Sequence, residues 1–215
     1  MPSITKITEQ RRRANRRNVF LDGTFAFGVN LNVIAKFRLR EGMTLSDAQV
    51  LEIQRGEVRQ ECFDKAMQYL QMRLHSRAEL GKKLMRREYG QAVVDGVLDD
   101  LVRLGYLNDE QFARTKALSA SEHKHHGRRR VKIELLKSGI KGDIADRALD
   151  DVFAQTDSLA NAKLLARKQG PRLRKLDPTV ARRRLVGMLQ RRGFDYETIK
   201  PVVDEVLGGR DADET

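Results

Sequence analysis

The sequence has little of what stabilises small secreted or β-rich proteins. Its 215 residues include one cysteine, no tryptophan and four prolines, and aromatic residues make up 6%. A single cysteine, Cys62, excludes an intrachain disulfide and indicates a reducing compartment. Cys62 lies in a helical pattern, where we expect a small core residue and not a nucleophile. The scarcity of aromatic residues favours helices with aliphatic seams over a β-sandwich.

Segments that would direct the chain to a membrane are also missing. Residues Met1–Lys6 carry no apolar run of the kind found in signal peptides. No hydrophobic stretch approaches the length of a membrane span. We therefore expect a soluble cytoplasmic protein.

Motifs for catalysis are absent as well. There is no Gly-rich Walker loop and no His-Glu-x-x-His pair. His123, His125 and His126 lie close together beside Lys124, but no further ligands follow at a spacing typical of metal sites. We expect an exposed basic loop there, with no metal, no cofactor and no catalytic residue, and hence a protein that is not an enzyme.

What the sequence has in excess is positive charge. Lysine and arginine number 42 against 30 aspartates and glutamates, which gives a formal net charge of +12 at pH 7. A balance of this size points to a polyanionic partner, either nucleic acid or an acidic protein surface. A solubilising charge without any partner is the third interpretation.

The N-terminal segment, 1–56, is expected to form a small module around a β-hairpin. Asp22-Gly23 separates two β-prone runs and suits a two-residue turn with positive φ, which places Phe20 opposite Phe25. Residues 4–8 add a third strand. A basic run lies between the strands and is either a solvated loop or an arm that contacts phosphate. It comprises Arg11, Arg12, Arg13, Arg16 and Arg17.

Helical periodicity governs the rest of the chain. A short helix is expected at 31–37, and Thr44 or Ser46 caps a second helix that ends near Gln54, with a break at Gly56. Further helices are expected at about 57–74, 76–89, 91–104, 109–122, 157–168, 178–192 and 195–207, with a basic and an acidic helix within 127–153.

Three local features of these helices carry specific expectations. Gly170-Pro171 should interrupt the chain. Pro201 should cause a kink or a late start of the last helix, because its ring clashes with the preceding turn. Phe112 and Leu118 should both point inward.

A three-helix pattern occurs three times. The segments that begin at Leu98, Leu149 and Val203 align with one another, and the upstream leucines Leu84, Leu135 and Leu189 then fall at one equivalent position. Units of about fifty residues bury too little surface alone, so neighbours should stack. The expected fold class is mainly α: three tandem three-helix repeats in an elongated, curved array after the N-terminal module. The expected boundaries are 1–56, 57–106, 107–154 and 155–208, with a disordered tail at 209–215.

Basic and acidic residues are distributed over the helices in the same way in each repeat. The second helices carry cations that either form a solvated face or line one surface suited to nucleic-acid phosphates. These contact candidates are Arg77, Lys82, Lys83, Arg86, Arg87, Arg128, Arg129, Arg130, Lys132, Lys137, Arg182, Arg183, Arg184, Arg191 and Arg192.

The third helices are acidic and carry adjacent carboxylates, here called the paired acids. They are Asp99-Asp100, Asp150-Asp151 and Asp204-Glu205. Adjacent carboxylates on a helix point in different directions, unlike the converging ligands of a metal-dependent nuclease. We therefore expect the paired acids to complement neighbouring arginines.

Three segments of the chain resemble the RecX family, regulators of the RecA recombinase. They are Ser76-Arg-Ala-Glu-Leu80 with Leu84, Val97-Leu-Asp-Asp-Leu101 with Gly105–Ala113, and Gly127-Arg128 with Ile133-Glu-Leu135 and Gly139-Ile140. The resemblance covers about residues 57–207, and the hairpin-bearing front resembles an extra N-terminal module of some members. It implies tandem three-helix units that lie in the groove of the RecA–DNA filament and limit its ATPase and strand-exchange activities.

The resemblance implies a non-enzymatic, monomeric regulator of homologous recombination and DNA repair that touches single-stranded or double-stranded DNA. Blocking the groove, capping filament growth and favouring disassembly remain alternatives. The competing hypothesis is a general nucleic-acid-binding protein that acts without recombinase. Few aromatic residues lie on the basic helices, so base stacking is poorly supplied, which disfavours that hypothesis.

Overall fold

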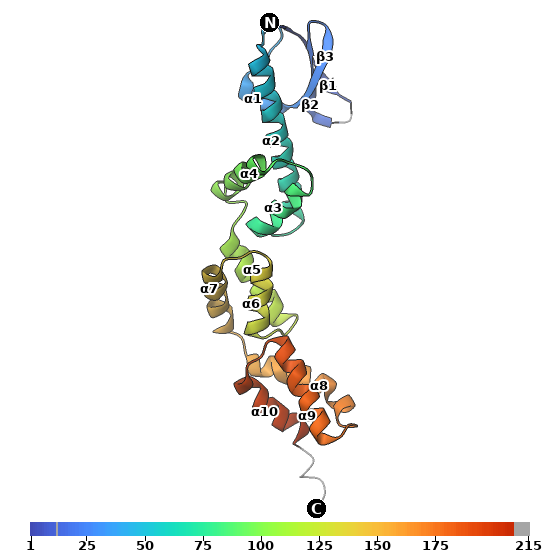
Figure 1. The fold of residues 1–215 in the computed structure, drawn as a ribbon, viewed down its shortest axis with the longest axis vertical. Coiled ribbons are helices and arrows are strands. Elements are labelled where there is room, and N and C mark those ends of the chain that lie inside the picture. Colours follow the sequence, from blue (N-terminus) through green and yellow to red (C-terminus); the bar gives the residue numbers. More distant parts are fainter. Residues whose placement is uncertain (12, 209–215) are drawn as a thin grey trace, which may run out of the picture. The chain divides into compact units, whose positions relative to one another are not determined.

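The computed structural model of the protein describes residues 1–11 and 13–208. These residues form two compact units, one made of Met1–Leu74 with Leu80–Tyr106, the other of His75–Glu79 with the chain from Leu107 onward (Figure 1). Arg12 of the basic run and the predicted disordered tail at 209–215 lie outside the described residues. Within the described part of the chain, no helix is both long and apolar enough to cross a membrane.

The first unit begins with an antiparallel sheet in the order β1-β2-β3, formed by β1 (Ile4–Gln10), β2 (Arg13–Leu21) and β3 (Thr24–Asn30). Asp22 and Gly23 join β2 to β3 with φ values of 48° and 84°, the two positive angles that this tight hairpin needs. Phe20 pairs with Phe25, and their rings meet edge to face with centroids 6.0 Å apart. The predicted hairpin and third strand are confirmed.

Of the described residues of the basic run, Arg11 lies in an exposed turn, whereas Arg13, Arg16 and Arg17 belong to β2. The prediction of a solvated loop is therefore wrong for these three, and contact of the run with phosphate stays a prediction. Arg16 and Arg17 lie within the strand, and Arg16 Nη1 is 2.8 Å from Glu57 Oε1 and 2.6 Å from Glu61 Oε1. Glu57 Oε2 also accepts the Asn30 N–H at 2.6 Å. Burial raises the pKa of Glu57, although the Asn30 N–H and the Arg16 charge both act to lower it. The run thus ties the sheet to the helix that carries Glu57.

Two helices follow the sheet, α1 (Leu31–Phe37) and α2 (Asp47–Met72). Ser46 caps α2 through a capping box with Gln49. The predicted end near Gln54 and break at Gly56 are wrong, because α2 continues through both. A Cβ on Gly56 would lie only 2.8 Å from Phe37 Cε2. The glycine therefore permits α1 to pack closely against α2 and does not end the helix.

The first unit also contains α3 (Arg77–Met85), apart from its first turn, and α4 (Gln91–Arg103). Val94, Val97, Leu98 and Leu101 form the buried face of α4. Cys62 of α2 is fully buried, and this burial raises the pKa of its thiol to about 11. The side chain is therefore a neutral core residue, as predicted, and not a thiolate nucleophile.

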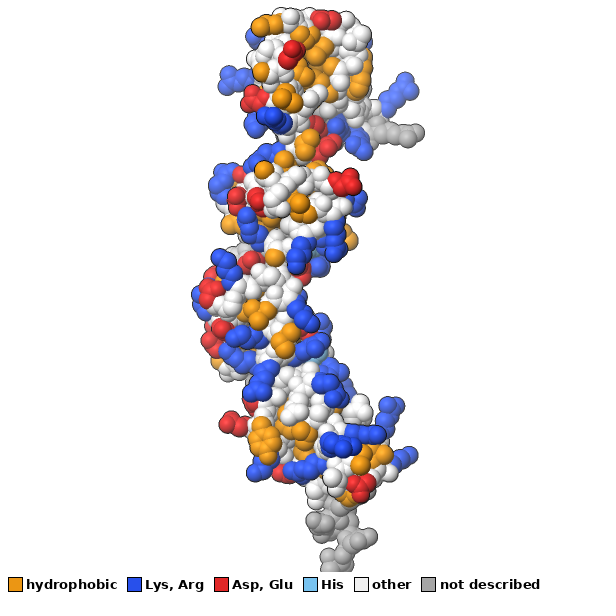
Figure 2. All heavy atoms as spheres, in the orientation of Figure 1, with side chains coloured by type: hydrophobic (Ala, Val, Ile, Leu, Met, Phe, Trp, Pro, Cys, Tyr) orange, Lys and Arg blue, Asp and Glu red, His pale blue; other side chains and the backbone are white. Residues whose placement is uncertain are grey.

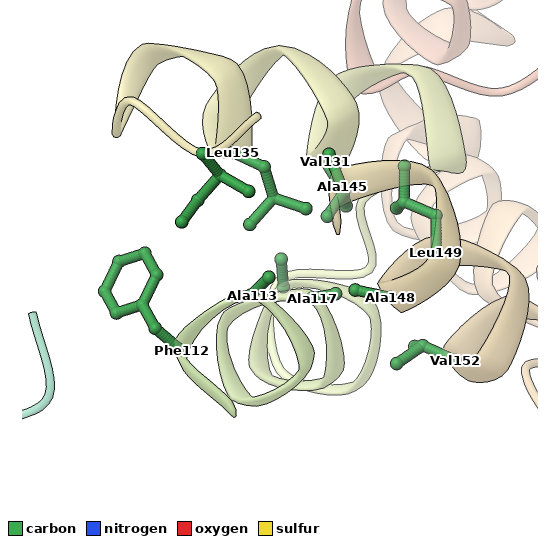
Figure 3. Packing of buried hydrophobic residues seen from close by; sticks show 11 residues of the cluster. Phe112, Ala113, Ala117, Val131, Leu135, Ala145, Ala148, Leu149 and Val152 are labelled. Carbon is green, nitrogen blue, oxygen red and sulfur yellow. The ribbon is translucent and has the colours of Figure 1, made fainter. Parts of the chain in front are cut away.

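The second unit continues with α5 (Asp109–Glu122), α6 (Arg128–Lys137) and α7 (Gly142–Phe153). Val131 and Leu135 of α6 pack over the alanines of α5 and against Leu149 of α7 (Figure 3). Phe112 is buried as predicted, but Leu118 is 43% exposed, so its predicted inward orientation is wrong. The alanines of α5, including the neighbouring Ala117, occupy the inward stripe, and Leu118 follows about 100° further around the helix.

The last three helices are α8 (Ser158–Leu173), α9 (Pro178–Arg192) and α10 (Tyr196–Leu207). The interruption predicted at Gly170-Pro171 is wrong, because α8 runs through it and ends only after the buried Leu173. Of the two alternatives predicted for Pro201, the late start of α10 is wrong and the kink stays a prediction. The helix begins directly after its cap, Asp195, and continues through Pro201. In both helices, burial of apolar residues beyond the proline outweighs the hydrogen bond that proline cannot donate.

The three-helix pattern read from the sequence corresponds to three structural repeats. Repeat 1 is built from α2–α4, repeat 2 from α5–α7 and repeat 3 from α8–α10. The two apolar positions aligned on the second helices are fully buried in every repeat: Leu80 and Leu84, Val131 and Leu135, and Leu185 and Leu189. The fold is therefore mainly helical, with three three-helix repeats after a small sheet-bearing module.

Candidate nucleic-acid interface

The first residue of each paired acid ties the third helix to the second in repeats 2 and 3. In repeat 2, Asp150 Oδ1 lies 2.6 Å from Arg128 Nη2. In repeat 3, Asp204 Oδ1 lies 2.9 Å from Arg182 Nη1. Two contact candidates therefore hold equivalent positions in the framework of their repeats.

The second residue of each paired acid ties the third helix to the first. Asp100 pairs with Arg59, Asp151 with Arg114, and Glu205 with Lys163 and Arg167. The predicted complementarity of the paired acids with neighbouring arginines is confirmed by these contacts.

Hydrogen bonds from the partner cations stabilise the charged form of these carboxylates. The pKa of Asp100 is lowered chiefly by its hydrogen bond with Arg103, and the hydrogen bond from Arg59 adds to this effect. The pKa of Glu205 is lowered by hydrogen bonds from Lys163 and then Arg167. In Asp100 and Glu205 these contacts therefore favour the anionic form that links the third helix to the first.

Helix α6 uses most of its candidate cations within the repeat. Besides Arg128, Arg130 Nε lies 3.0 Å from Glu134 Oε1, and Lys132 Nζ lies 2.6 Å from Asp146 Oδ1. Arg129 and Lys137 are exposed and have no ion-pair partner among the described residues.

Helix α9 leaves most of its candidate cations unpaired. Arg182 is linked to Asp204, but the other four arginines are exposed and pair with no carboxylate in residues 1–11 and 13–208. They are Arg183, Arg184, Arg191 and Arg192. Exposed guanidinium groups of this kind are free to meet phosphate or carboxylate on a partner.

Helix α3 combines its cations with the aromatic ring of Tyr69 from α2. Lys83 Nζ lies 4.8 Å from the centroid of the Tyr69 ring, and Arg87 Nε donates to the Tyr69 hydroxyl at 3.4 Å. The Arg87 hydrogen bond lowers the pKa of Tyr69. Lys82 and Arg86 are exposed. Packing of α2 beside α3 creates this basic–aromatic group, and no local sequence signal places Tyr69 there.

The basic helices α6 and α9 adjoin end to end within the second unit. The Gly127 N–H donates to Arg192 O at 2.8 Å, and the Arg129 N–H donates to Gly193 O at 3.2 Å. A Cβ on Gly193, whose φ is +91°, would collide with the backbone of Arg130. The N-terminus of α6 thus meets the C-terminus of α9, an arrangement that also aligns the helix dipoles favourably.

A similar joint brings the first turn of α3 onto the other end of α6. The Ser76 hydroxyl donates to Ser138 O at 2.5 Å and accepts the Glu79 N–H at 3.0 Å. The Arg77 N–H donates to Asp109 Oδ1 at 2.7 Å. This contact explains why His75–Glu79 belongs to the second unit.

The histidine cluster matches the predicted exposed loop only in part, because His123 and Lys124 are exposed but His125 and His126 are partly buried. His125 Nδ1 lies 2.9 Å from Asn161 Oδ1, and the half-buried His126 lies 3.2 Å from Glu134. Burial lowers the pKa of His126, while the charge of Glu134 acts to raise it. In the part of the chain that the structure describes, no group of three or more His, Cys, Asp or Glu residues is arranged to hold a metal ion.

Family models match nearly the whole chain in consecutive segments. Residues 2–46 match the N-terminal domain of regulatory protein RecX. Residues 62–101, 108–149 and 155–203 match the first, second and third three-helix domains of RecX.

Curated relatives agree with these matches. Regulatory protein RecX of Bacillus subtilis is 32% identical over 99% of this chain and 80% of its own length. Regulatory protein RecX of Bacillus velezensis is 31% identical over 95% of this chain and 78% of its own length.

Two crystal structures share the fold. One of regulatory protein RecX aligns with a TM-score of 0.80 at 24% identity, covering 95% of this chain and all of that chain. That of RecX from Lactobacillus salivarius has a TM-score of 0.62 at 23% identity, covering 70% of this chain and 97% of that chain.

Proposed function

This chain belongs to the RecX family of regulatory proteins, and from that premise we propose that it binds the RecA recombinase filament on DNA and limits its activity. It acts as a monomer in the cytoplasm, where its basic helices lie in the filament groove. Binding there limits ATP turnover, strand exchange and filament growth. The protein contributes no chemistry of its own.

The observation that carries this proposal is the set of exposed, unpaired cations on α9 and at the adjoining end of α6. Arg191 and Arg192 lie in the last turn of α9, and Arg129 lies in the first turn of α6 that meets it. A recombinase filament on DNA presents phosphates at regular spacing, and cations that meet them release condensed counterions. A continuous basic surface over two helices suits such a partner better than a small anion.

The paired acids support a binding role over a catalytic one. In repeats 2 and 3 they form ion pairs between helices, as in the contacts of Asp150 with Arg128 and of Asp204 with Arg182. Carboxylates used in this way are anchored to the framework and do not converge on one point. We infer that they position the basic helices and do not activate a nucleophile.

The proposal is tested by titrating the protein into RecA filaments assembled on single-stranded DNA while ATP hydrolysis is followed. We expect turnover to fall as the protein is added and the protein to sediment with the filaments. Saturation near a fixed ratio to recombinase subunits indicates groove binding, whereas inhibition at a far smaller ratio indicates end capping. Unchanged turnover together with no co-sedimentation would contradict the proposal.

Matched variants separate the proposed surface from general charge. Arg191→Glu/Arg192→Glu and Lys141→Glu/Lys200→Glu change the net charge equally, and all four side chains are exposed. Only the first pair should weaken inhibition. A parallel titration of labelled DNA without recombinase tests the competing function: tight, salt-sensitive binding to DNA with no effect on filaments would favour a general nucleic-acid-binding protein.

A further inference from the structure

A hollow of about 620 Å³ lies between the end of α8 and the exposed side of α9. We call it the arginine hollow; it is lined by Gln169, Arg172, Leu173, Leu176, Arg183, Arg184, Met188 and Arg191. Figure 2 shows basic side chains gathered around hydrophobic ones over these two helices. The hollow combines two surface types, a cationic rim and an apolar floor.

The rim has no internal counter-charge. Its four arginines all line the hollow, and they form no ion pair with any described carboxylate. Like charges that line one hollow repel one another unless an anion lies between them. The rim therefore favours an anionic occupant.

The apolar floor distinguishes between a nucleic acid and a protein segment as the anionic occupant. Leu173, Leu176 and Met188 all belong to or pack against the apolar core of repeat 3. A sugar–phosphate backbone would satisfy the rim but leave this floor in water, and the hollow has no aromatic ring among its lining residues on which a base could stack. Methionine and arginine around an apolar centre are typical of protein–protein interfaces. A protein segment suits both parts of the hollow.

Repeat 2 lacks the same combination at the aligned position. When Leu189 is aligned with Leu135, Met188 of α9 corresponds to Glu134 of α6. Glu134 lies 3.0 Å from Arg130 and 3.2 Å from His126, so the charge of α6 is compensated there. The combination of arginine rim and Met188 is thus not shared by repeat 2 and does not follow from the repeat pattern alone.

We propose that the arginine hollow docks an acidic segment of the recombinase subunit that carries a large apolar side chain. The apolar side chain covers the floor, and flanking carboxylates meet the arginine rim. This inference rests on the proposed function, because the recombinase supplies the segment. It assigns protein contact to the hollow and leaves DNA contact to the other exposed cations of α6 and α9.

Two variants of the full chain test the floor and the rim separately. Met188→Gln makes the floor polar without changing the charge, and Arg183→Gln/Arg191→Gln removes half of the rim. The matched control, Arg129→Gln/Lys137→Gln, removes two cations from the aligned positions of α6. Binding is measured by sedimentation with RecA filaments on single-stranded DNA, and by fluorescence anisotropy with the same labelled DNA alone.

We expect Met188→Gln and the rim variant each to weaken filament binding roughly tenfold, as loss of an interface anchor typically does. On DNA alone, Met188→Gln and the rim variant should both bind like the wild type, because DNA contact is left to the other exposed cations. The rim residues are exposed, so that variant keeps its fold and decides the question even where Met188→Gln is destabilised.

Two results would overturn the docking proposal while leaving the proposed function intact. One is wild-type filament binding by both the rim variant and Met188→Gln. The other is an equal loss of filament and DNA binding by the rim variant, which would assign the hollow to nucleic acid. Failure of the wild type itself to bind filaments would instead overturn the proposed function, and the docking proposal with it.

Discussion

Repeats 2 and 3 share one framework but use their basic helices differently. Both have fully buried leucines at aligned positions and an ion pair from the second helix to the third. Among the described residues, α6 has three of its five candidate cations in ion pairs, Arg128, Arg130 and Lys132. Helix α9 has one of five, Arg182. The two helices carry equal numbers of candidate cations, but α9 leaves more of them without an ion-pair partner among the described residues.

Two aligned positions explain the difference. Glu134 of repeat 2 corresponds to Met188 of repeat 3, so Arg184 lacks the neighbour that Arg130 has. Lys132 corresponds to Val186, so α9 has no cation there to pair with the third helix. Repeat 2 thus uses most of the charge of its basic helix in ion pairs within the repeat, whereas repeat 3 leaves most of its basic helix without ion pairs to described carboxylates.

The largest expected effect tests whether the two frameworks are equivalent. Leu135→Ala and Leu189→Ala should each destabilise the protein by about 2–5 kcal/mol, because both delete fully buried packing. Denaturant unfolding measures the loss. Leu136→Ala, at a position 45% exposed, is the control and should cost far less. A loss below about 1 kcal/mol at either buried position would break the alignment of the repeats.

The joint between the repeats should give the next largest effect. Gly193→Ala should cost about 2–3 kcal/mol, since φ is +91° and the new Cβ collides with the α6 backbone. Gly105→Ala is the matched control: its φ is +76°, but nothing lies within 4 Å of the new Cβ. It should cost only the backbone strain, about 1–2 kcal/mol. If thermal unfolding gives the same loss of stability for Gly193→Ala and Gly105→Ala, the close contact between α9 and α6 does not restrict the residue at position 193.

Charge reversals at aligned positions test whether α6 and α9 contribute differently to filament binding. Arg184→Glu should weaken filament binding about tenfold, or about 1.4 kcal/mol, because Arg184 has no internal partner. Arg130→Glu should weaken it less than threefold, because Arg130 is held by Glu134. Arg183→Glu, in the rim of the arginine hollow, should also weaken filament binding more than Arg129→Glu. Co-sedimentation titrations measure filament binding by all four variants. A larger loss of binding for Arg130→Glu than for Arg184→Glu would contradict the assignment of filament contact to Arg184.

The smallest expected effect concerns the link between the second and third helices. Asp150→Asn and Asp204→Asn should each cost less than about 1 kcal/mol, because both ion pairs are largely solvent-exposed. The two losses should agree within the error of denaturant unfolding. A loss of stability several times larger in one repeat would show that the packing of that repeat depends on this ion pair. The two repeats would then not be equivalent.

Local sequence signals predicted the elements well where the responsible contacts are local. Ser46, one of the two predicted candidates, caps its helix, and Asp22-Gly23 forms the predicted hairpin turn. Each of these signals acts within a few residues of itself. Repetition of apolar spacing then identified the buried leucines, because three copies of one pattern reinforce one another.

Breaker residues were misinterpreted where tertiary packing decides the outcome. Gly56 looked like a hinge, but its function depends on the ring of Phe37, which approaches from another helix. Pro171 lies inside a helix whose following turn is held by a buried leucine. The effect of such residues on the backbone depends on neighbours that are distant in sequence.

The sequence predicted which cations belong to the candidate surface. It did not predict which of them lack an ion-pair partner among the described residues. The sequence assigned the same weight to Arg128 and Arg183, yet only the first has an internal partner among the described residues. Aligning Glu134 with Met188 could have revealed part of this difference. The arginine hollow needed the packing of α8 against α9, and the basic–aromatic group of Tyr69 needed that of α2 beside α3.

Arginine footprinting tests the central claim most directly. The protein, alone and bound to RecA filaments on single-stranded DNA, is treated briefly with phenylglyoxal, and modified arginines are identified by mass spectrometry. The account predicts strong protection of Arg183, Arg184, Arg191 and Arg192 on filaments, with little change at Arg128 and Arg182, which are already paired. Equal protection of both groups, or protection confined to the paired arginines, would contradict it.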